Sequence, residues 1–232
     1  MAGGAAPRQL ALALGHSESF VREDFLEGPS NADALALIER WPDWPSRTVA
    51  LTGPEGSGKS HLAAIWAEAA GARFLAARAL DTVDLPAALA TGALVVEDLA
   101  PGTAERALFH LLNLARQQEA YLLVTARTAP ARWTSGLADL TSRLRAIPVV
   151  AVAPPDDVLL RAVLVKLFAD RQVKVEESLI AYLATRLERS FAAARAAVER
   201  LDREALRLKR PVTRALASEL LREPVQDGQG GC

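Results

Sequence analysis

Gly53-Pro54-Glu55-Gly56-Ser57-Gly58-Lys59-Ser60 is a glycine-rich loop that ends in a lysine and a serine. It follows the apolar, β-branched run at 48–52 and precedes a helical pattern over 59–70. A strand, a glycine-rich loop and a helix in this order form the setting of a phosphate-binding P-loop. The glycines let backbone N–H groups turn toward an anion at a helix N-terminus, where the peptide dipoles favour negative charge. We therefore expect a nucleoside phosphate to bind here.

The end of this loop carries two side chains with different predicted roles. Lys59 is expected to reach the terminal phosphates, and the Ser60 hydroxyl is expected to ligate Mg²⁺. The predicted cofactors are ATP or ADP, together with Mg²⁺. With the histidine that follows the loop, the predicted nucleotide-binding residues are Gly53, Pro54, Glu55, Gly56, Ser57, Gly58, Lys59, Ser60 and His61.

The composition narrows the class of protein. The chain has 232 residues, is 50% hydrophobic and has a net charge of −1, which argues against an autonomous DNA-binding protein with a strongly basic surface. Its one cysteine, Cys232, has no intramolecular partner, which favours a reducing compartment. The three histidines lack metal-ligand spacing, and no apolar run is long enough to span a bilayer. We expect a cytoplasmic protein with no membrane partner.

Short apolar strands alternate with helical patterns between residue 20 and about residue 150. Strands separated by helices indicate right-handed βαβ units and a parallel sheet covered on both faces. After Pro154-Pro155 only helical patterns remain, the first capped by Asp156 or Asp157 and the last by Thr213. The predicted strands are 49–52, 73–76, 93–96, 121–125 and 147–152.

The predicted fold class is an α/β parallel-sheet domain followed by a small all-α domain. This layout resembles the AAA+ family of P-loop NTPases, whose helical lid closes over the nucleotide. The expected division is a flexible arm at 1–19, an α/β nucleotide-binding domain at 20–153, a helical lid domain at 154–222 and a disordered tail at 223–232.

A second acidic motif, Leu94-Val95-Val96-Glu97-Asp98, ends the third predicted strand, where the AAA+ family places one. Carboxylates at this point hold the Mg²⁺ shell and orient an attacking water. The family's usual order of an Asp followed by a second acid is changed here to Glu97-Asp98. Either Glu97 takes the metal position with Asp98 beside the water, or Asp98 alone serves the metal. A solvated strand end is the alternative reading.

Three further segments resemble the DnaA replication initiators, one branch of the AAA+ family. Phe25-Leu26-Glu27-Gly28-Pro29-Ser30-Asn31 is similar to their segment that lines the adenine pocket, and Gly58-Lys59-Ser60-His61-Leu62 has their histidine after the P-loop hydroxyl. Asp139-Leu140-Thr141-Ser142-Arg143-Leu144 resembles their Ser-Arg signature. The resemblance implies that Arg143 is an arginine finger directed in trans at a neighbouring nucleotide, since a planar, permanently charged fork can neutralise a transferring phosphoryl group. A surface salt bridge is the alternative for Arg143.

Gln9-Leu10-Ala11-Leu12-Ala13-Leu14, in the arm, resembles the clamp-binding peptide of Hda-like proteins, which are DnaA homologues without a DNA-binding domain. An extended peptide with a glutamine and alternate leucines can fill a hydrophobic groove. The resemblance implies that Gln9, Leu10, Leu12 and Leu14 bind the sliding clamp, the beta subunit of DNA polymerase III. The sequence ends about ten residues after its last helical pattern, so we expect DNA contact only through the clamp.

The resemblance implies a negative regulator of chromosomal replication initiation. Bound to the DNA-loaded clamp, such a protein promotes hydrolysis of the ATP held by the DnaA initiator. Two alternatives remain: an autonomous AAA+ ATPase of the helicase-loader kind, and an adaptor that binds nucleotide and clamp without promoting hydrolysis.

The residues expected to support the chain's own ATP hydrolysis depart from the DnaA pattern. The position of the second-sensor arginine in the lid is Ala192, with Arg189 and Arg195 one turn to either side as possible substitutes. At the end of the fourth strand, where an acidic or amide sensor is expected, only Thr125 offers a hydrogen-bonding group. We therefore expect tight nucleotide binding, weak intrinsic hydrolysis and stimulation of a partner's ATPase in trans.

Overall fold

The computed structural model describes residues 20–222. Five parallel strands form one sheet in the order β2-β3-β4-β1-β5. No helix among the described residues is long and apolar enough to cross a membrane. The strands are β1 (Thr48–Thr52), β2 (Arg73–Ala76), β3 (Ala93–Leu99), β4 (Tyr121–Ala126) and β5 (Val149–Ala151).

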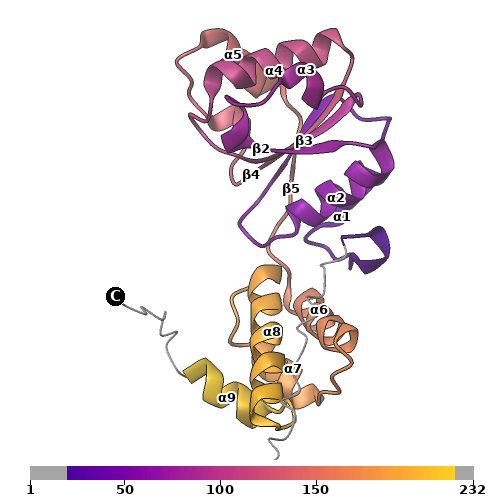
Figure 1. The fold of residues 1–232 in the computed structure, drawn as a ribbon, viewed down its shortest axis with the longest axis vertical. Helices are drawn as coiled ribbons and strands as arrows, with labels where there is room; N and C mark the ends of the chain where they lie inside the picture. The colour runs from indigo at the N-terminus through magenta and orange to yellow at the C-terminus, as the bar shows by residue number, and fades with distance from the viewer. Residues whose placement is uncertain (1–19, 223–232) are drawn as a thin grey trace, which may run out of the picture.

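Helices cover both faces of this sheet (Figure 1). Successive side chains of a strand point to opposite faces, so Leu94 and Val96 of β3 pack into one core while Val95 packs into the other. The first core lies under α3 (Leu85–Ala88), α4 (Glu105–Gln117), α5 (Ala138–Ala146) and the short turns η2 (Ala77–Ala79) and η3 (Pro130–Arg132). The second lies under α1 (Ala32–Glu39) and α2 (Lys59–Ala70), and the turn η1 (Arg22–Asp24) precedes α1.

In the part of the chain that the structure describes, four more helices follow β5 and pack around a third core of their own. Figure 1 shows them below the sheet, on the side where α1 and α2 lie. Two caps expected from the sequence are present: the Asp156 carboxylate accepts from Leu159 N at 2.7 Å, and the Thr213 hydroxyl accepts from Leu216 N at 3.3 Å. The helices are α6 (Asp157–Asp170), α7 (Glu177–Ala184), α8 (Phe191–Leu208) and α9 (Arg214–Arg222).

The predicted fold class, a parallel α/β sheet with an additional helical region, is confirmed. The elements differ from the predicted ones mainly at their ends. Strand β3 continues to Leu99, so Glu97 and Asp98 lie within it rather than after it. Helix α7 ends at Ala184, and Leu187 lies in the connection to α8.

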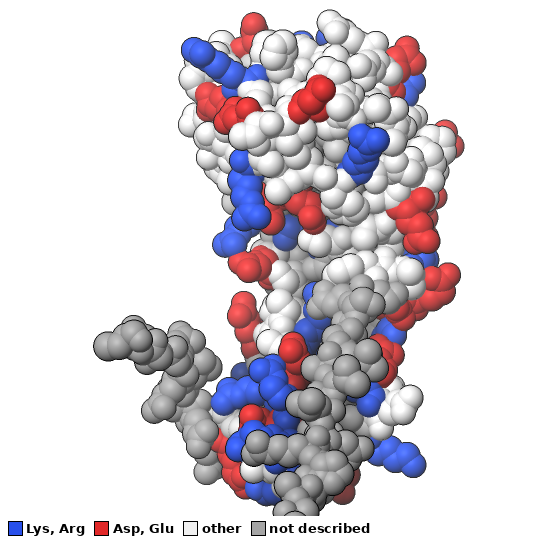
Figure 2. All heavy atoms as spheres, viewed as in Figure 1, with Lys and Arg blue, Asp and Glu red and all other residues white. Residues whose placement is uncertain are grey.

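The surface carries basic and acidic side chains side by side (Figure 2). On α8, Arg203 forms an ion pair with Glu199 at 3.2 Å, and Arg210, in the connection between α8 and α9, forms one with Glu219 of α9 at 3.1 Å. These helix faces therefore have the mixed charge of an ordinary solvated surface.

Candidate functional site

The P-loop connects the carboxyl end of β1 to the first turn of α2. Gly58, the N-cap of α2, has φ 98°, a left-handed conformation that glycine adopts without steric cost. Gly53 is required for a different reason, since a Cβ there would lie 2.1 Å from the carbonyl oxygen of Val152. The backbone N–H groups of 56–60 meet no acceptor among the described residues. Unpaired N–H groups at a helix N-terminus are the arrangement that the predicted anion cradle requires.

Inside this loop the Ser57 hydroxyl is buried and has no hydrogen-bond partner among the described residues. A buried polar atom without a partner is costly, and a phosphate oxygen would supply the missing bond. Ser60, at the second position of α2, is exposed, so its hydroxyl is open to a metal ion. The loop therefore fits a nucleoside phosphate with Mg²⁺.

Lys59 is 8% exposed and folds back over the loop. Its Nζ donates to the carbonyl oxygens of Gly53 at 2.9 Å and Pro54 at 2.7 Å. Burial lowers the pKa of Lys59 from 10.5, the positive charge of Arg127 lowers it further, and the carboxylates of Asp98 and Glu55 oppose the change. The lysine thus lies in the loop, among the charges that surround the predicted phosphate site.

Of the two carboxylates that oppose the lowering of the Lys59 pKa, Asp98 has the larger effect. Strand β3 is irregular at this point, because its register with β4 shifts between Val96 and Leu99 and Asp98 has φ 56°. Such bulges redirect a side chain beside functional sites. Glu97 keeps its regular pairing opposite Ala76 of β2. This geometry favours the second of the two alternatives, in which Asp98 serves the metal.

The turn at Asp98 is held by Thr125 of β4. The Asp98 backbone N–H donates to the Thr125 hydroxyl at 3.0 Å, and Thr125 is 1% exposed. The sequence predicts a hydrogen-bonding group at this position, and in the structure the Thr125 hydroxyl accepts from the backbone of the acidic residue.

The residue that follows β4, Arg127, places a positive charge beside the P-loop. Arg127 forms an ion pair with Glu55, and both side chains are largely exposed. Sequence reasoning did not give Arg127 a role. Its position could have pointed to a role, because Arg127 directly follows β4, where a polar sensor residue is expected.

His61, predicted to bind nucleotide, lies in the first turn of α2. Its Nε2 is 3.0 Å from the carbonyl oxygen of Val21, and its ring meets the rings of Phe20 and Phe25 edge to face, at centroid distances of 5.2 Å and 5.1 Å. These contacts attach the segment before α1 to the helix that follows the P-loop. The role of His61 in nucleotide binding stays a prediction.

The N-terminus of α8 rests directly on the P-loop. The Phe191 N–H donates to the Gly56 carbonyl oxygen at 2.8 Å. A Cβ built on Gly58 would lie 3.2 Å from the Phe191 ring, and one on Gly56 would lie 3.0 Å from the Ala192 Cβ. The position expected to hold a sensor arginine therefore touches the loop with a methyl group.

The two candidate substitutes for that arginine have other contacts. Arg189 forms an ion pair with Asp157 at 2.9 Å. The Arg195 guanidinium lies over the Phe20 ring, 5.8 Å from its centroid. Sequence reasoning left both open.

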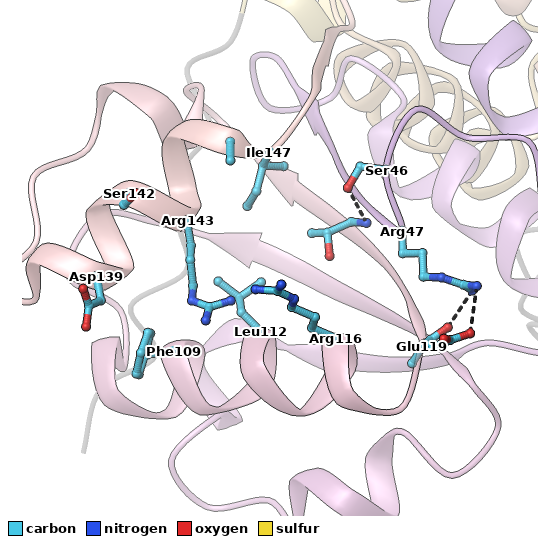
Figure 3. A pocket seen from close by; sticks show the side chains of 13 residues that line it. Ser46, Arg47, Phe109, Leu112, Arg116, Glu119, Asp139, Ser142, Arg143 and Ile147 are labelled. Carbon is cyan, nitrogen blue, oxygen red and sulfur yellow. Dashed lines mark hydrogen bonds and ion pairs between the residues drawn. The ribbon is translucent and has the colours of Figure 1, made fainter.

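Arg143 lies at a distance from this cradle, in α5. Its guanidinium lies over the Phe109 ring of α4, 5.3 Å from the ring centroid. It lines a groove together with Phe109 and Arg47 (Figure 3). Thr48, at the beginning of β1, also lines this groove, whereas the P-loop follows the end of the same strand. The described residues offer it no ion pair, so the surface salt bridge considered for Arg143 is absent there. Gln9, Leu10, Leu12 and Leu14 lie outside the described residues.

Comparison with known proteins agrees with this geometry. No protein-family model matches the chain. The chain is 27% identical over 256 residues to the chromosomal replication initiator protein DnaA of Thermomicrobium roseum, in a match that covers 95% of this chain and 54% of that protein. It thus spans about half the length of this curated relative.

Solved structures share the fold at lower identity. Domain III of the Thermotoga maritima replication initiation protein DnaA superposes with a TM-score of 0.74 at 17% identity, covering 89% of this chain and 97% of that one. AMPPCP-bound DnaA from Aquifex aeolicus gives 0.64 at 14% identity, covering 79% and 65%. The Thermotoga maritima RuvB Holliday junction branch migration motor gives 0.65 at 16% identity, covering 88% and 72%.

Proposed function

On the premise of a DnaA-like AAA+ fold, we propose that this chain is a nucleotide-binding regulator of replication initiation, similar to the Hda-like proteins. In this proposal it promotes hydrolysis of the ATP held by DnaA. The observation that carries the proposal is the placement of Arg143. Its guanidinium is supported by Phe109, has no ion-pair partner among the described residues, and lies at the opposite end of β1 from the chain's own P-loop. An arginine so placed serves a neighbour's nucleotide rather than its own.

Arg143 acts through charge. Phosphoryl transfer spreads negative charge over the oxygens of the transferring group, and an arginine supplied in trans stabilises it. The stacking on Phe109 limits the rotamers of the side chain before the partner arrives. Less conformational entropy is then lost when the complex forms.

The chain's own P-loop holds ATP or ADP in this proposal. The N–H cradle at 56–60, the Ser57 hydroxyl and Lys59 bind the phosphates, and Ser60 with Asp98 holds Mg²⁺. Bound Mg²⁺ would neutralise phosphate charge. The AMPPCP carried by a solved structure of the same fold supports this part of the proposal. Because Ala192 brings no cation to the loop, the bound nucleotide serves mainly to shape the protein and turns over slowly.

Gln9, Leu10, Leu12 and Leu14 bind the sliding clamp in this proposal. Tethering to the DNA-loaded clamp raises the local concentration of the two partners, so that each contact is individually weak. Inactivation of DnaA then follows clamp loading, and DNA is reached only through the clamp.

The test measures how fast preloaded DnaA-ATP becomes DnaA-ADP in the presence of this protein and clamp loaded on DNA. We expect acceleration by the wild-type chain, and none by Arg143→Ala or by Gln9→Ala with Leu10→Ala. The control is Arg132→Ala, which removes an arginine from η3 instead. Unchanged conversion with the wild-type chain rejects the regulator, and acceleration that survives Arg143→Ala rejects the finger.

A second candidate function, an autonomous ATPase, is favoured by one observation: the chain has both a lysine in its P-loop, Lys59, and an acid near the end of β3, Asp98, which are the two groups that a P-loop enzyme needs. This candidate requires rapid multiple turnover of ATP by the chain alone, stimulated by DNA. A steady-state ATPase assay with and without single-stranded DNA separates the two functions.

A further inference from the structure

A groove of about 860 Å³ runs between α4 and α5, at the amino ends of the strands. Thr48 and Ala120, which lie at or just before the beginnings of β1 and β4, form part of its wall, so it opens at the edge of the sheet opposite the P-loop. Three arginines line it: Arg47, Arg116 and Arg143.

One of these arginines is already neutralised. Arg47 donates to the Glu119 carbonyl oxygen at 2.7 Å and to its carboxylate at 3.2 Å. It also lies over the Tyr121 ring, 4.9 Å from the centroid. Glu119 thus forms its ion pair with Arg47, and among the described residues it forms none with the other two arginines of the groove.

Arg116 and Arg143 are the unneutralised pair. Figure 3 shows their guanidinium groups extending toward each other from α4 and α5, on either side of Leu112. Neither has an ion pair or a side-chain hydrogen bond with a described residue. Asp139, one turn before Arg143, also lines the groove but forms no ion pair with it. Two like charges that converge without an acid between them are stabilised by a bound anion.

We propose that Arg116 and Arg143 form one phosphate-binding site, in which Arg116 is a second cation for the phosphates of the nucleotide held by a partner. The proposal rests on the function proposed above and extends it. A polyphosphate fits because it offers several charged oxygens to two guanidinium forks at once. An acidic side chain offers only one carboxylate. Ser142, next to Arg143 in the same groove, adds a hydroxyl donor.

The binding test uses inorganic tripolyphosphate and does not involve DnaA. The full chain is treated with an arginine-selective dicarbonyl reagent, and modification at each arginine is measured by mass spectrometry. We expect tripolyphosphate to protect Arg116 and Arg143 together, also in Lys59→Met, whose P-loop is weakened. Arg106, an exposed residue of α4, is the internal control. Protection of neither arginine, or of Arg143 alone, overturns the proposal.

The functional test compares Arg116→Ala, Arg116→Lys and Arg106→Ala in the DnaA-ATP conversion assay. We expect Arg116→Ala to slow stimulated conversion about ten-fold, because one charge-assisted contact to phosphate is lost, and Arg116→Lys to recover part of it. If Arg116→Ala stimulates conversion as strongly as the wild-type chain, the partner's nucleotide is not the ligand of Arg116. A third outcome is that tripolyphosphate protects both arginines of the wild-type chain but this chain does not accelerate conversion. That outcome rejects the regulator function and supports a site for free polyphosphate.

Discussion

The backbone N–H of Phe191, at the start of α8, donates to the carbonyl oxygen of Gly56 in the P-loop at 2.8 Å. This bond joins two elements that lie far apart in the sequence, and it uses no side chain that a motif could reveal. The Phe191 ring and the Ala192 methyl group pack beside it, against Gly58 and Gly56. At this contact the helical region meets the phosphate loop through a phenyl ring and a methyl group.

The first prediction concerns this attachment. Gly56→Ala places a Cβ 2.9 Å from the Ser190 Cβ at a backbone with φ +71°, so it strains the loop and pushes α8 away. We expect a loss of about 1–2 kcal/mol of unfolding free energy and nucleotide affinity weakened roughly ten-fold. Denaturant unfolding and titration with a fluorescent ADP measure the two effects.

Gly71→Ala is the matched control, because Gly71 has φ +62° but a Cβ there would meet nothing within 4 Å. It should cost about as much stability, through the same backbone strain, and leave nucleotide affinity unchanged. Equal affinities for the two variants would show that the contact with α8 does not support nucleotide binding.

The second prediction concerns Lys59 and pH. Burial lowers the pKa of Lys59 below 10.5, so the ammonium group that binds phosphate is lost at a lower pH than in an ordinary lysine. Nucleotide affinity of the wild-type chain should therefore begin to fall before pH 10.5. Lys59→Met should weaken binding roughly ten- to hundred-fold at neutral pH and remove this dependence.

The same shift has a consequence for stability. The folded-state pKa is lowered, so the cost of keeping Lys59 charged is fully present below that pKa and disappears as the pH rises toward 10.5. The unfolding free energy of the wild-type chain, relative to Lys59→Met, should rise over this window. Lys174→Met, at an exposed position, serves as the control, and a flat difference between wild type and Lys59→Met would contradict the prediction.

The third prediction concerns the acceptor of the Asp98 N–H. Thr125→Val keeps the shape of the buried side chain but removes the hydroxyl 3.0 Å from that N–H. We expect a loss of about 1–3 kcal/mol of unfolding free energy and weaker Mg²⁺-dependent nucleotide binding, because the turn that aims Asp98 loosens. Thr125→Ser retains the hydroxyl and should keep the Mg²⁺ dependence. Nucleotide titrations with and without Mg²⁺ decide between these outcomes.

The fourth prediction restores the missing sensor. Ala192 is exposed and lies beside Gly56, so Ala192→Arg can direct a guanidinium toward the terminal phosphate. We expect roughly ten-fold tighter binding of ATP relative to ADP, and faster single-turnover hydrolysis than the slow wild-type rate. Ala196→Arg, one turn further along α8 and also exposed, should change neither. Fast hydrolysis by the wild-type chain itself would refute the weak intrinsic turnover that we expect.

The sequence alone determined the layers of the fold. The glycine-rich loop before Lys59, the alternation of apolar strands with helices and the change to purely helical patterns after Pro155 are local features. Local propensity and hydrophobic period therefore sufficed to predict them. The P-loop and Ser60 were predicted for the same reason, because one continuous segment builds the cradle.

Only the tertiary structure decided which groups meet. The different backbone settings of Asp98 and Glu97 depend on a bulge that the Thr125 hydroxyl of a neighbouring strand holds. The attachment of Phe191 to Gly56 is a bond between backbone atoms, and the pairing of Arg116 with Arg143 arises from two helices packed on one face of the sheet. Contacts between segments distant in sequence are set by strand order and side-chain packing, which periodicity within one segment does not encode.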